Sequence, residues 1–213
     1  MRQLRQGIYR EHQMIWDLLP RDPEQARDFL YRREDSQNWP FYYLLSERKP
    51  EDSRDFLQVS TQLYNPQLRT GDALYFSLRA NAVISRKADD VSKRRIRRDI
   101  VEARIDEYRA QEPDSSLWPP KAYIHQEAGE AWLRRQGEKL GFQVESLSVQ
   151  NHQYHQFYKP GDRQDNNQRQ FSSLDFSGVL RVTDARLFVE GALFSGIGRA
   201  KAYGCGLLLV KRT

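Results

Sequence analysis

The spacing of apolar and polar residues predicts amphipathic helices at both ends of the chain. The first lies over 8–19, where apolar residues recur at the helical period of 3.6 residues and a proline follows. A second is expected over 22–34, because an aspartate can cap its start, a proline suits its first turn and apolar residues supply one side. Two more are expected over 127–140, ended by Gly141, and over 184–194.

Alternating or short apolar segments predict strands between these helices. Residues 73–80, ALYFSLRA, place Leu74, Phe76 and Leu78 on one face of a half-buried strand. The other expected strands are 41–46, 56–60, 142–157, 171–182 and 207–211. Because only the polar segment KPGDRQDNNQR separates 142–157 from 171–182, these two strands are expected to form a long hairpin.

The middle of the chain differs in character and suggests an inter-domain connection. It is rich in charge, with the basic run SKRRIRR at 92–98 and a polar helical segment at 100–110. The basic run is either a solvated segment or a nucleic-acid contact. The order of helices and strands around it favours an α+β fold with two units and antiparallel sheets. The expected units are an N-terminal domain over 1–85, a charged linker over 86–120 and a C-terminal domain over 121–213.

Composition places the chain among soluble globular proteins, since 38% of its 213 residues are hydrophobic and 30% are charged. No run approaches the roughly 18 apolar residues of a membrane span, and the N-terminus lacks an apolar signal core. The single cysteine, Cys205, cannot form an internal disulfide, and no Cys/His set has zinc spacing. We therefore expect a cytoplasmic protein without a bound metal. A net charge of +5 favours polyanionic partners only weakly.

Glycines gather near the C-terminus in the pattern G-x-G-x5-G-x-G, at Gly196, Gly198, Gly204 and Gly206. Glycine permits positive φ, and a glycine-rich turn beside a helix end can cradle phosphate with backbone N–H groups. The phosphate-loop and dinucleotide signatures are both absent, so a nucleotide cofactor is not expected. The alternative is a tight structural connection between a helix and a strand.

The histidines carry little chemistry when the residues are considered alone. His12 shares the apolar arc of the first helix, which is typical of a hydrogen-bonded core histidine. The spacing of His152 and His155 puts them on opposite faces of a regular strand, so they favour polar surface or RNA-facing positions over a metal pair. His125 is expected to be structural or exposed, and Cys205 to be a small packing residue.

The segment GALFSGIGRAKAYGCGLLLVK, at 191–211, resembles the C-terminal signature of the CRISPR repeat-processing endoribonucleases, and specifically of their CasE branch. Further matches occur in the same order along most of the chain. They are Tyr9-x-x-His12, ARDFL at 26–30, LYFSLRAN at 74–81, AWL at 131–133, GF at 141–142 and FSGVL at 176–180.

The resemblance implies two tandem ferredoxin-like (RRM-like) domains. That family begins with a β-strand before the histidine helix, whereas this sequence starts almost at the helix. The first strand of the N-terminal domain is therefore expected to be missing from this chain, or the start to have been assigned too late. A missing central strand would expose backbone groups and apolar surface.

The resemblance also implies metal-independent cleavage of a repeat RNA at the base of its hairpin. The 2′-hydroxyl would attack the adjacent phosphorus, a 5′-hydroxyl would leave and a 2′,3′-cyclic phosphate would remain. This requires proton transfer, in-line positioning and charge stabilisation, but no cofactor. The resemblance makes His12 the proton-transfer residue, since an imidazole titrates near pH ~6.5. Tyr9, one helical turn earlier, would orient the nucleophile or bind phosphate.

Positively charged residues are expected to hold the RNA through its shape and its phosphates. Arg27 is assigned to the neighbourhood of the active site, or alternatively to a surface ion pair. The expected RNA contacts are Arg27, Lys121, Lys159, Arg163, Arg169, Arg199 and Lys201.

The expected partners are the CRISPR repeat RNA hairpin and the other subunits of the type I-E surveillance complex, with no membrane. Outside that complex we expect a monomer. A function of a different class stays open, namely an RNA-hairpin-binding structural subunit that does not cut. A scaffold of that kind would not need the imidazole of His12.

Overall fold

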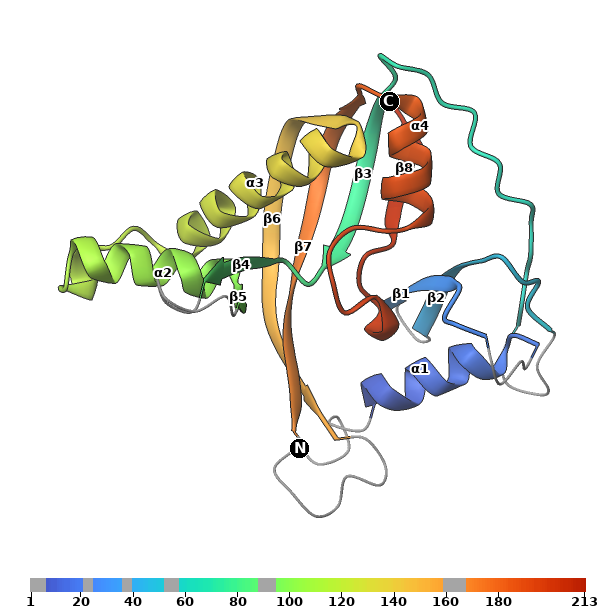
Figure 1. Ribbon diagram of the computed structural model, residues 1–213, viewed down its shortest axis with the longest axis horizontal. Coiled ribbons are helices and arrows are strands. Elements are labelled where there is room, and N and C mark those ends of the chain that lie inside the picture. The colour runs from blue at the N-terminus through green and yellow to red at the C-terminus, as the bar shows by residue number, and fades with distance from the viewer. Residues whose placement is uncertain (1–6, 21–24, 36–39, 52–57, 88–94, 159–167) are drawn as a thin grey trace.

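The computed structural model describes residues 7–20, 25–35, 40–51, 58–87, 95–158 and 168–213. It has a mixed α/β architecture with antiparallel sheets (Figure 1). The elements are α1 (Gly7–Asp17), β1 (Phe29–Asp35), β2 (Pro40–Ser46), β3 (Ala73–Ala80), β4 (Val83–Lys87), β5 (Arg95–Asp99), α2 (Ile100–Gln111), η2 (Ser115–Leu117), α3 (Lys121–Leu140), β6 (Phe142–Phe157), β7 (Arg169–Val182), α4 (Ala185–Leu187), η3 (Phe188–Phe194), η4 (Lys201–Tyr203) and β8 (Leu208–Arg212).

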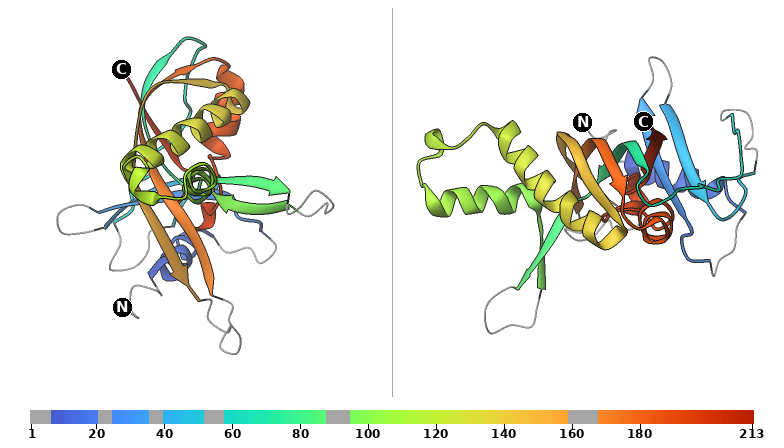
Figure 2. Two further views of the ribbon diagram at one scale, coloured as in Figure 1. Left: turned by 90° about the vertical axis from the view of Figure 1, so that its left-hand side faces the viewer. Right: turned by 90° about the horizontal axis from the view of Figure 1, so that it is seen from above.

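A four-stranded antiparallel sheet, in the spatial order β6-β7-β3-β8, forms the centre of the molecule. Along the chain, these strands and the helices that connect them follow the order β3, α3, β6, β7, α4, β8. Helix α3 therefore connects β3 to β6, and α4 connects β7 to β8, and neither pair of strands is adjacent in the sheet. Both helices lie on the same face of the sheet (Figures 1 and 2). The main core forms between these layers. It includes Leu74, Leu78, Trp132, Phe176 and Phe188, and burying one such side chain stabilises the fold by about 1.5–3 kcal/mol.

The N-terminal elements form a smaller unit beside this sheet. Helix α1 packs on the antiparallel hairpin β1–β2 around a second core that contains Ile15 and Tyr31. Arg79 on β3 joins the two parts, because its guanidinium binds both carboxylate oxygens of Asp175, at 2.7 and 3.0 Å, and donates to the Arg33 carbonyl at 3.2 Å. The hydrogen bond to Arg33 therefore ties β1 to an arginine that a half-buried ion pair fixes within the central sheet.

Hairpin β6–β7 extends well beyond the central sheet (Figure 1). The two strands pair from Phe142↔Val182 to Phe157↔Arg169, whereas β3 pairs with β7 only as far as Leu174. The outer part of the hairpin is therefore a two-stranded arm. The polar segment at its tip, over 159–167, lies outside the described residues.

The segment expected to be a charged linker contributes to the main core. Strands β4 and β5 form an antiparallel hairpin, and α2 follows directly and packs against α3. Ile100 and Val101 are both buried in the main core. The helix predicted at 100–110 is confirmed as α2. No helix or strand was predicted in the rest of the segment, because its few buried residues are separated by charged ones.

Strand pairing does not follow the domain boundaries expected at residues 85 and 121. Strand β3 precedes residue 85, yet it lies between β7 and β8 in the central sheet. The sheet therefore joins a segment that was assigned to the N-terminal domain with three that were assigned to the C-terminal domain.

The helix predicted over 22–34 is wrong. Residues 25–28 have no regular structure and Phe29–Asp35 forms β1, while 22–24 lie outside the described part of the chain. The consecutive residues Phe29, Leu30 and Tyr31 are all buried, at 3%, 4% and 1% exposure. Successive side chains of a strand point to opposite faces, so β1 is covered on both. Phe29 and Tyr31 pack in the core with α1, and Leu30 packs against the glycine-rich loop.

The strand predicted over 56–60 is also wrong where it is described, since 58–60 have no regular structure. The other predicted helices and strands are confirmed with small shifts at their ends. The exception is α3, which begins earlier than predicted, at Lys121. Gly141 ends that helix with a left-handed φ of 73°, as the sequence indicated.

Candidate functional site

The glycine-rich loop runs from Gly196 to Gly206 and packs between the end of β3 and strand β1. All four of its predicted glycines have positive φ, from 75° to 91°. The Gly206 amide donates to the Arg79 carbonyl at 2.7 Å, and the Gly206 carbonyl accepts from Ile197 at 2.9 Å. A Cβ at Gly204 would lie 3.4 Å from the Tyr31 ring. The glycines therefore allow a tightly folded loop to lie directly on the neighbouring strands.

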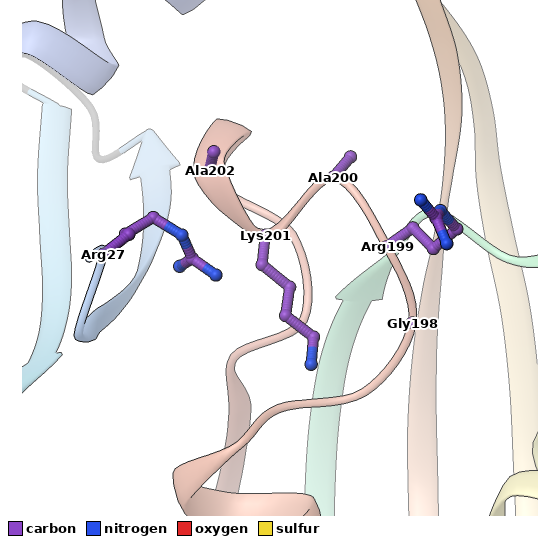
Figure 3. Close-up of a pocket in the computed structure, with 6 residues that line it drawn as sticks. All are labelled: Arg27, Gly198, Arg199, Ala200, Lys201 and Ala202. Carbon is purple, nitrogen blue, oxygen red and sulfur yellow. The ribbon is translucent and has the colours of Figure 1, made fainter.

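One side of this loop borders a cavity of about 340 Å³ that is rich in positive charge. Its lining consists of Arg27, Gly198, Arg199, Ala200, Lys201 and Ala202 (Figure 3). The guanidinium of Arg27 points toward Lys201 across the space between β1 and the loop. All three of the basic residues in this lining, Arg27, Arg199 and Lys201, were predicted from the sequence, and the fold brings Arg27 to the loop that carries the other two.

Electrostatics make this cavity suitable for an anion. Burial lowers the pKa of Lys201, and the nearby charge of Arg27 lowers it further. Burial also lowers the pKa of Arg27. The ammonium of Lys201 is held by the Ser195 carbonyl at 2.6 Å, and Arg27 donates to the Phe29 carbonyl. An anion between the two cations would offset their repulsion and their loss of solvent.

His12 lies beside the same loop. Its half-buried ring packs against Tyr203 of η4, with 5.8 Å between the ring centroids, and against Phe29 of β1, with 6.1 Å. Phe29 also lies under the guanidinium of Arg27, at 5.8 Å from carbon to centroid. Tyr9 is half-buried one helical turn before His12. Aromatic contacts thus connect the imidazole of α1 to the residues that border the cationic cavity.

The remaining predicted RNA contacts do not border this cavity. Lys121 begins α3 and is exposed, about 16 Å along the helix axis from Trp132, which packs against Gly198 of the loop. Arg169 is exposed at the outer end of β7, on the two-stranded arm. Lys159 and Arg163 lie outside the described residues. Any surface that includes Lys121 and Arg169 must therefore extend well beyond the cavity.

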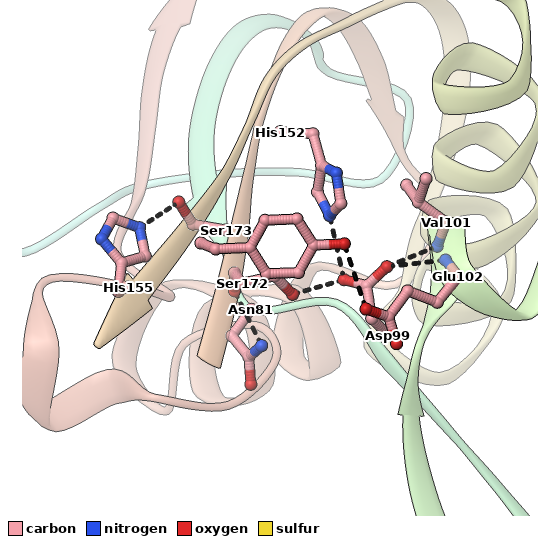
Figure 4. A network of polar contacts seen from close by, with 9 residues as sticks. Asn81, Asp99, Val101, Glu102, His152, His155, Ser172 and Ser173 are labelled. Carbon is pink, nitrogen blue, oxygen red and sulfur yellow. Dashed lines mark hydrogen bonds and ion pairs between the residues drawn. The ribbon is translucent and has the colours of Figure 1, made fainter. Parts of the chain in front are cut away.

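Sequence analysis missed a buried polar cluster around Asp99 (Figure 4). Asp99 caps helix α2 by accepting from the amides of Val101 and Glu102, at 2.8 and 2.9 Å. Its other carboxylate oxygen accepts from the Ser172 hydroxyl and lies 3.2 Å from Nε2 of His152. The cluster joins α2 to both strands of the long hairpin. An aspartate directly before a predicted helix is the sequence signal that identifies the cap.

The expectation that His152 is a polar surface or RNA-facing residue is wrong. Its side chain is only 6% exposed and pairs with Asp99. The pairing of β6 with β7 is irregular between Gln150 and Gln153, and Asn151 has a φ of 54°. A bulge of this kind redirects side chains relative to a regular strand, so the simple alternation of faces did not apply.

The other two histidines of this region are also enclosed to different degrees. His155 stacks on Phe171, with 4.6 Å between centroids, and its Nε2 lies 2.8 Å from the Ser173 hydroxyl. The His125 ring lies 5.2 Å from that of His152. Burial lowers the pKa of both His125 and His155. Cys205 is buried, as the sequence indicated, and burial raises the pKa of its thiol to about 12.

The described residues hold neither a cluster of metal ligands nor a helix that could span a membrane. No group of three or more His, Cys, Asp or Glu side chains in the described ranges could hold a metal ion. Among the helices of the described ranges, none combines the length and the apolar character needed to cross a bilayer.

Comparisons with known proteins agree over nearly the whole chain. A family model described as CRISPR associated protein matches residues 1–212. The CRISPR system Cascade subunit CasE of Escherichia coli K12 is 29% identical over 205 residues, which are 94% of this chain and 90% of that protein.

Two solved structures show the same fold. The CRISPR-associated protein Cas6e of Escherichia coli K-12 matches with a TM-score of 0.65 and 24% identity, covering 99% of this chain and 94% of its own. Cse3 of Thermus thermophilus, bound to an RNA that represents a pre-cleavage complex, matches with a TM-score of 0.68 and 23% identity. That match covers 96% of this chain and 88% of Cse3.

Proposed function

The chain belongs to the family of CRISPR associated proteins, and on this basis we propose that it is an endoribonuclease that processes precursor CRISPR RNA. The CasE branch that the sequence motifs indicated is confirmed by the comparisons. Its relatives include Cse3, a CRISPR endoribonuclease solved with bound RNA, and CasE, a Cascade subunit. The observation that carries the proposal is the cationic cavity of Arg27 and Lys201, whose lining continues directly into Tyr203, the residue on which the imidazole of His12 packs.

The proposed reaction is cleavage at the base of the repeat hairpin without a metal ion. The scissile phosphate occupies the cavity, where Arg27 and Lys201 stabilise the charge that develops on its oxygens. The 2′-hydroxyl of the RNA attacks the phosphorus, and the products carry a 2′,3′-cyclic phosphate and a 5′-hydroxyl. His12 either takes the proton from the attacking 2′-hydroxyl or gives a proton to the leaving 5′-oxygen. Tyr9 orients the attacking hydroxyl or binds a phosphate oxygen.

The RNA stem is proposed to lie along the protein beyond the cavity. Arg169, on the outer part of the long hairpin, and Lys121, at the start of α3, are both exposed and available to phosphates. Lys159 and Arg163 stay predictions at the tip of the same hairpin. After cleavage the protein is proposed to stay on the RNA as a subunit of a type I-E surveillance complex in the cytoplasm.

The fold is proposed to consist of tandem ferredoxin-like domains. The series β3-α3-β6-β7-α4-β8, with the strand order β6-β7-β3-β8, has the β-α-β-β-α-β arrangement of one such domain. In this proposal the C-terminal domain starts before residue 73 rather than after 120. Helix α1 and hairpin β1–β2 would belong to the N-terminal domain.

The test is cleavage of a labelled repeat hairpin in excess EDTA by the wild type, by His12→Ala and by His125→Ala as a matched histidine control. We expect one cut at the base of the stem, a cyclic phosphate, and binding without cleavage by His12→Ala. His125→Ala should retain cleavage. If the wild type binds the hairpin and does not cut it, the chain is an RNA-binding subunit and the proposed chemistry is wrong. Cleavage that stops in EDTA would refute metal independence alone.

A further inference from the structure

A second cavity, of about 350 Å³, also borders the glycine-rich loop. Gly198, Arg199 and Lys201 line both cavities, so the two cavities adjoin at this short stretch of loop. The far side of the second cavity is made by α3 and by the residues that follow β3. Its apolar lining consists of the half-buried Val83 and Leu140 together with the buried Trp132 and Ile197.

Two polar side chains of this cavity are available to a ligand. Gln136 of α3 is half-buried and lines it, and its amide makes no hydrogen bond to any other residue that the structure describes. Arg199 is exposed, with its guanidinium on the side of the loop away from Arg27 and Lys201 (Figure 3). By contrast, Asn81 is committed to the fold, because its side chain donates to the Ser172 carbonyl at 2.7 Å.

This combination of surfaces fits a nucleobase. Single-stranded RNA is read by apolar or aromatic contact with the base and by hydrogen bonds to its edge. A carboxamide both donates and accepts, and a guanidinium donates in a planar fork, so the two together suit the edge of a base. Because the two cavities share Gly198, Arg199 and Lys201 in their linings, neighbouring groups of one molecule can occupy both.

We propose that the second cavity binds the unpaired base of a nucleotide next to the phosphate in the first cavity, with Gln136 and Arg199 as its hydrogen-bonding residues. The proposal rests on the proposed function and adds to it a place where base identity at the cleavage site is read. Gln136 is accordingly a specificity residue, which does not touch the reacting atoms.

The test uses the intact repeat RNA and two variants that are abasic at the nucleotide before or after the cleavage site. Each is given to the wild type, to Gln136→Leu and to Arg199→Ala, and both Kd and the single-turnover rate are measured. Glu138→Leu is the control, since Glu138 is exposed on the same helix and does not line the cavity. Thermal unfolding confirms that each variant is folded.

For the wild type and for Glu138→Leu we expect one abasic RNA to bind about tenfold more weakly than the intact RNA. Gln136→Leu should bind intact RNA about tenfold more weakly and show little further loss with the abasic RNA, because the contact is already absent. If removal of either base weakens RNA binding by the same factor in the wild type, in Gln136→Leu and in Arg199→Ala, the proposal is wrong. The Kd values test the base-binding site, whereas the single-turnover cleavage rate tests the proposed chemistry. A protein that binds the RNA and does not cut it would therefore refute the endoribonuclease proposal, and its Kd values would still decide the base-binding proposal.

Discussion

Asp99 offers a sharp test of how the long hairpin is held, because one carboxylate joins three elements. It caps α2, accepts from Ser172 of β7 and pairs with His152 of β6, and its side chain is 10% exposed. Burial alone would raise the pKa of this carboxyl. The hydrogen bonds from His152, Ser172 and the Glu102 amide outweigh burial and lower the pKa below its ordinary value.

Replacing Asp99 with alanine removes the cap and leaves two buried polar groups without their acceptor. Loss of an N-cap costs about 1 kcal/mol, and each unsatisfied buried group costs about 1–3 kcal/mol. Together these losses come to about 3–7 kcal/mol. Removing one partner of a buried ion pair typically costs about 3–5 kcal/mol, and we expect Asp99→Ala to lower the free energy of unfolding by about that amount. Asp99→Asn retains the capping oxygen but replaces the oxygen that accepts from Ser172 and pairs with His152 by an amide NH2, which only donates. It should therefore be about 1 kcal/mol less destabilised than Asp99→Ala, which is the contribution of the cap.

The assay is thermal and urea unfolding at pH 7, followed by circular dichroism. For a chain of this size each kcal/mol corresponds to about 2–4 °C in Tm, so Asp99→Ala should unfold roughly 6–20 °C below the wild type. Asp114→Ala is the matched control, because Asp114 also caps a helix, with an exposed side chain that accepts from the Ser116 amide.

Asp99 also predicts a direction with pH. A lowered pKa in the folded state means that this carboxylate stabilises the fold above about pH 3.9, and that the contribution is lost as the pH falls below that value through the folded pKa. The reasoning is refuted if Asp99→Ala lowers Tm no more than Asp114→Ala does. It is also refuted if Asp99→Asn and Asp99→Ala are equally destabilised, since the cap would then contribute nothing.

Three further predictions concern other parts of the fold. Gly196→Ala should lower the free energy of unfolding by about 1–3 kcal/mol, because φ is 75° there and the new Cβ would lie 2.8 Å from the Gly206 carbonyl oxygen. Urea unfolding measures this change, with Gly7→Ala as the control because a Cβ at Gly7 meets open space. Equal stability of the two variants would contradict the reasoning. The thiol of Cys205, buried and with its pKa raised to about 12, should resist iodoacetamide at pH 8 until urea unfolds the protein, as mass spectrometry would show; rapid alkylation of the native protein would contradict this. As the pH falls through about 6.5, His125 and His155 should bind protons in the unfolded chain before they do so in the folded protein, so the free energy of unfolding should decrease. His155→Gln should make the decrease in stability between pH 7.5 and 5.5 shallower. An unchanged slope would exclude His155 as a cause of this decrease.

Local pattern alone was enough to predict elements whose residues differ clearly on their two faces. Strand β3 alternates buried and less buried residues along its length, so its bounds match the prediction at both ends. Gly141 and the four glycines of the loop were identified because positive φ is a local property of the backbone. In the segment expected to be a charged linker, over 86–120, the many charged residues concealed the few buried ones, such as Ile100 and Val101, that make it part of the core.

The sequence by itself determined the family, through motifs in a fixed order, and most of the helices and strands, through periodicity. Only the tertiary structure decided that Phe29–Asp35 is a strand, because burial on both of its faces comes from α1 and the glycine-rich loop. It also decided that β3 lies between β7 and β8, that Arg27 meets Lys201, and that His152 is buried. The physical reason is that these properties depend on contacts between residues far apart in the chain, which a local pattern does not contain.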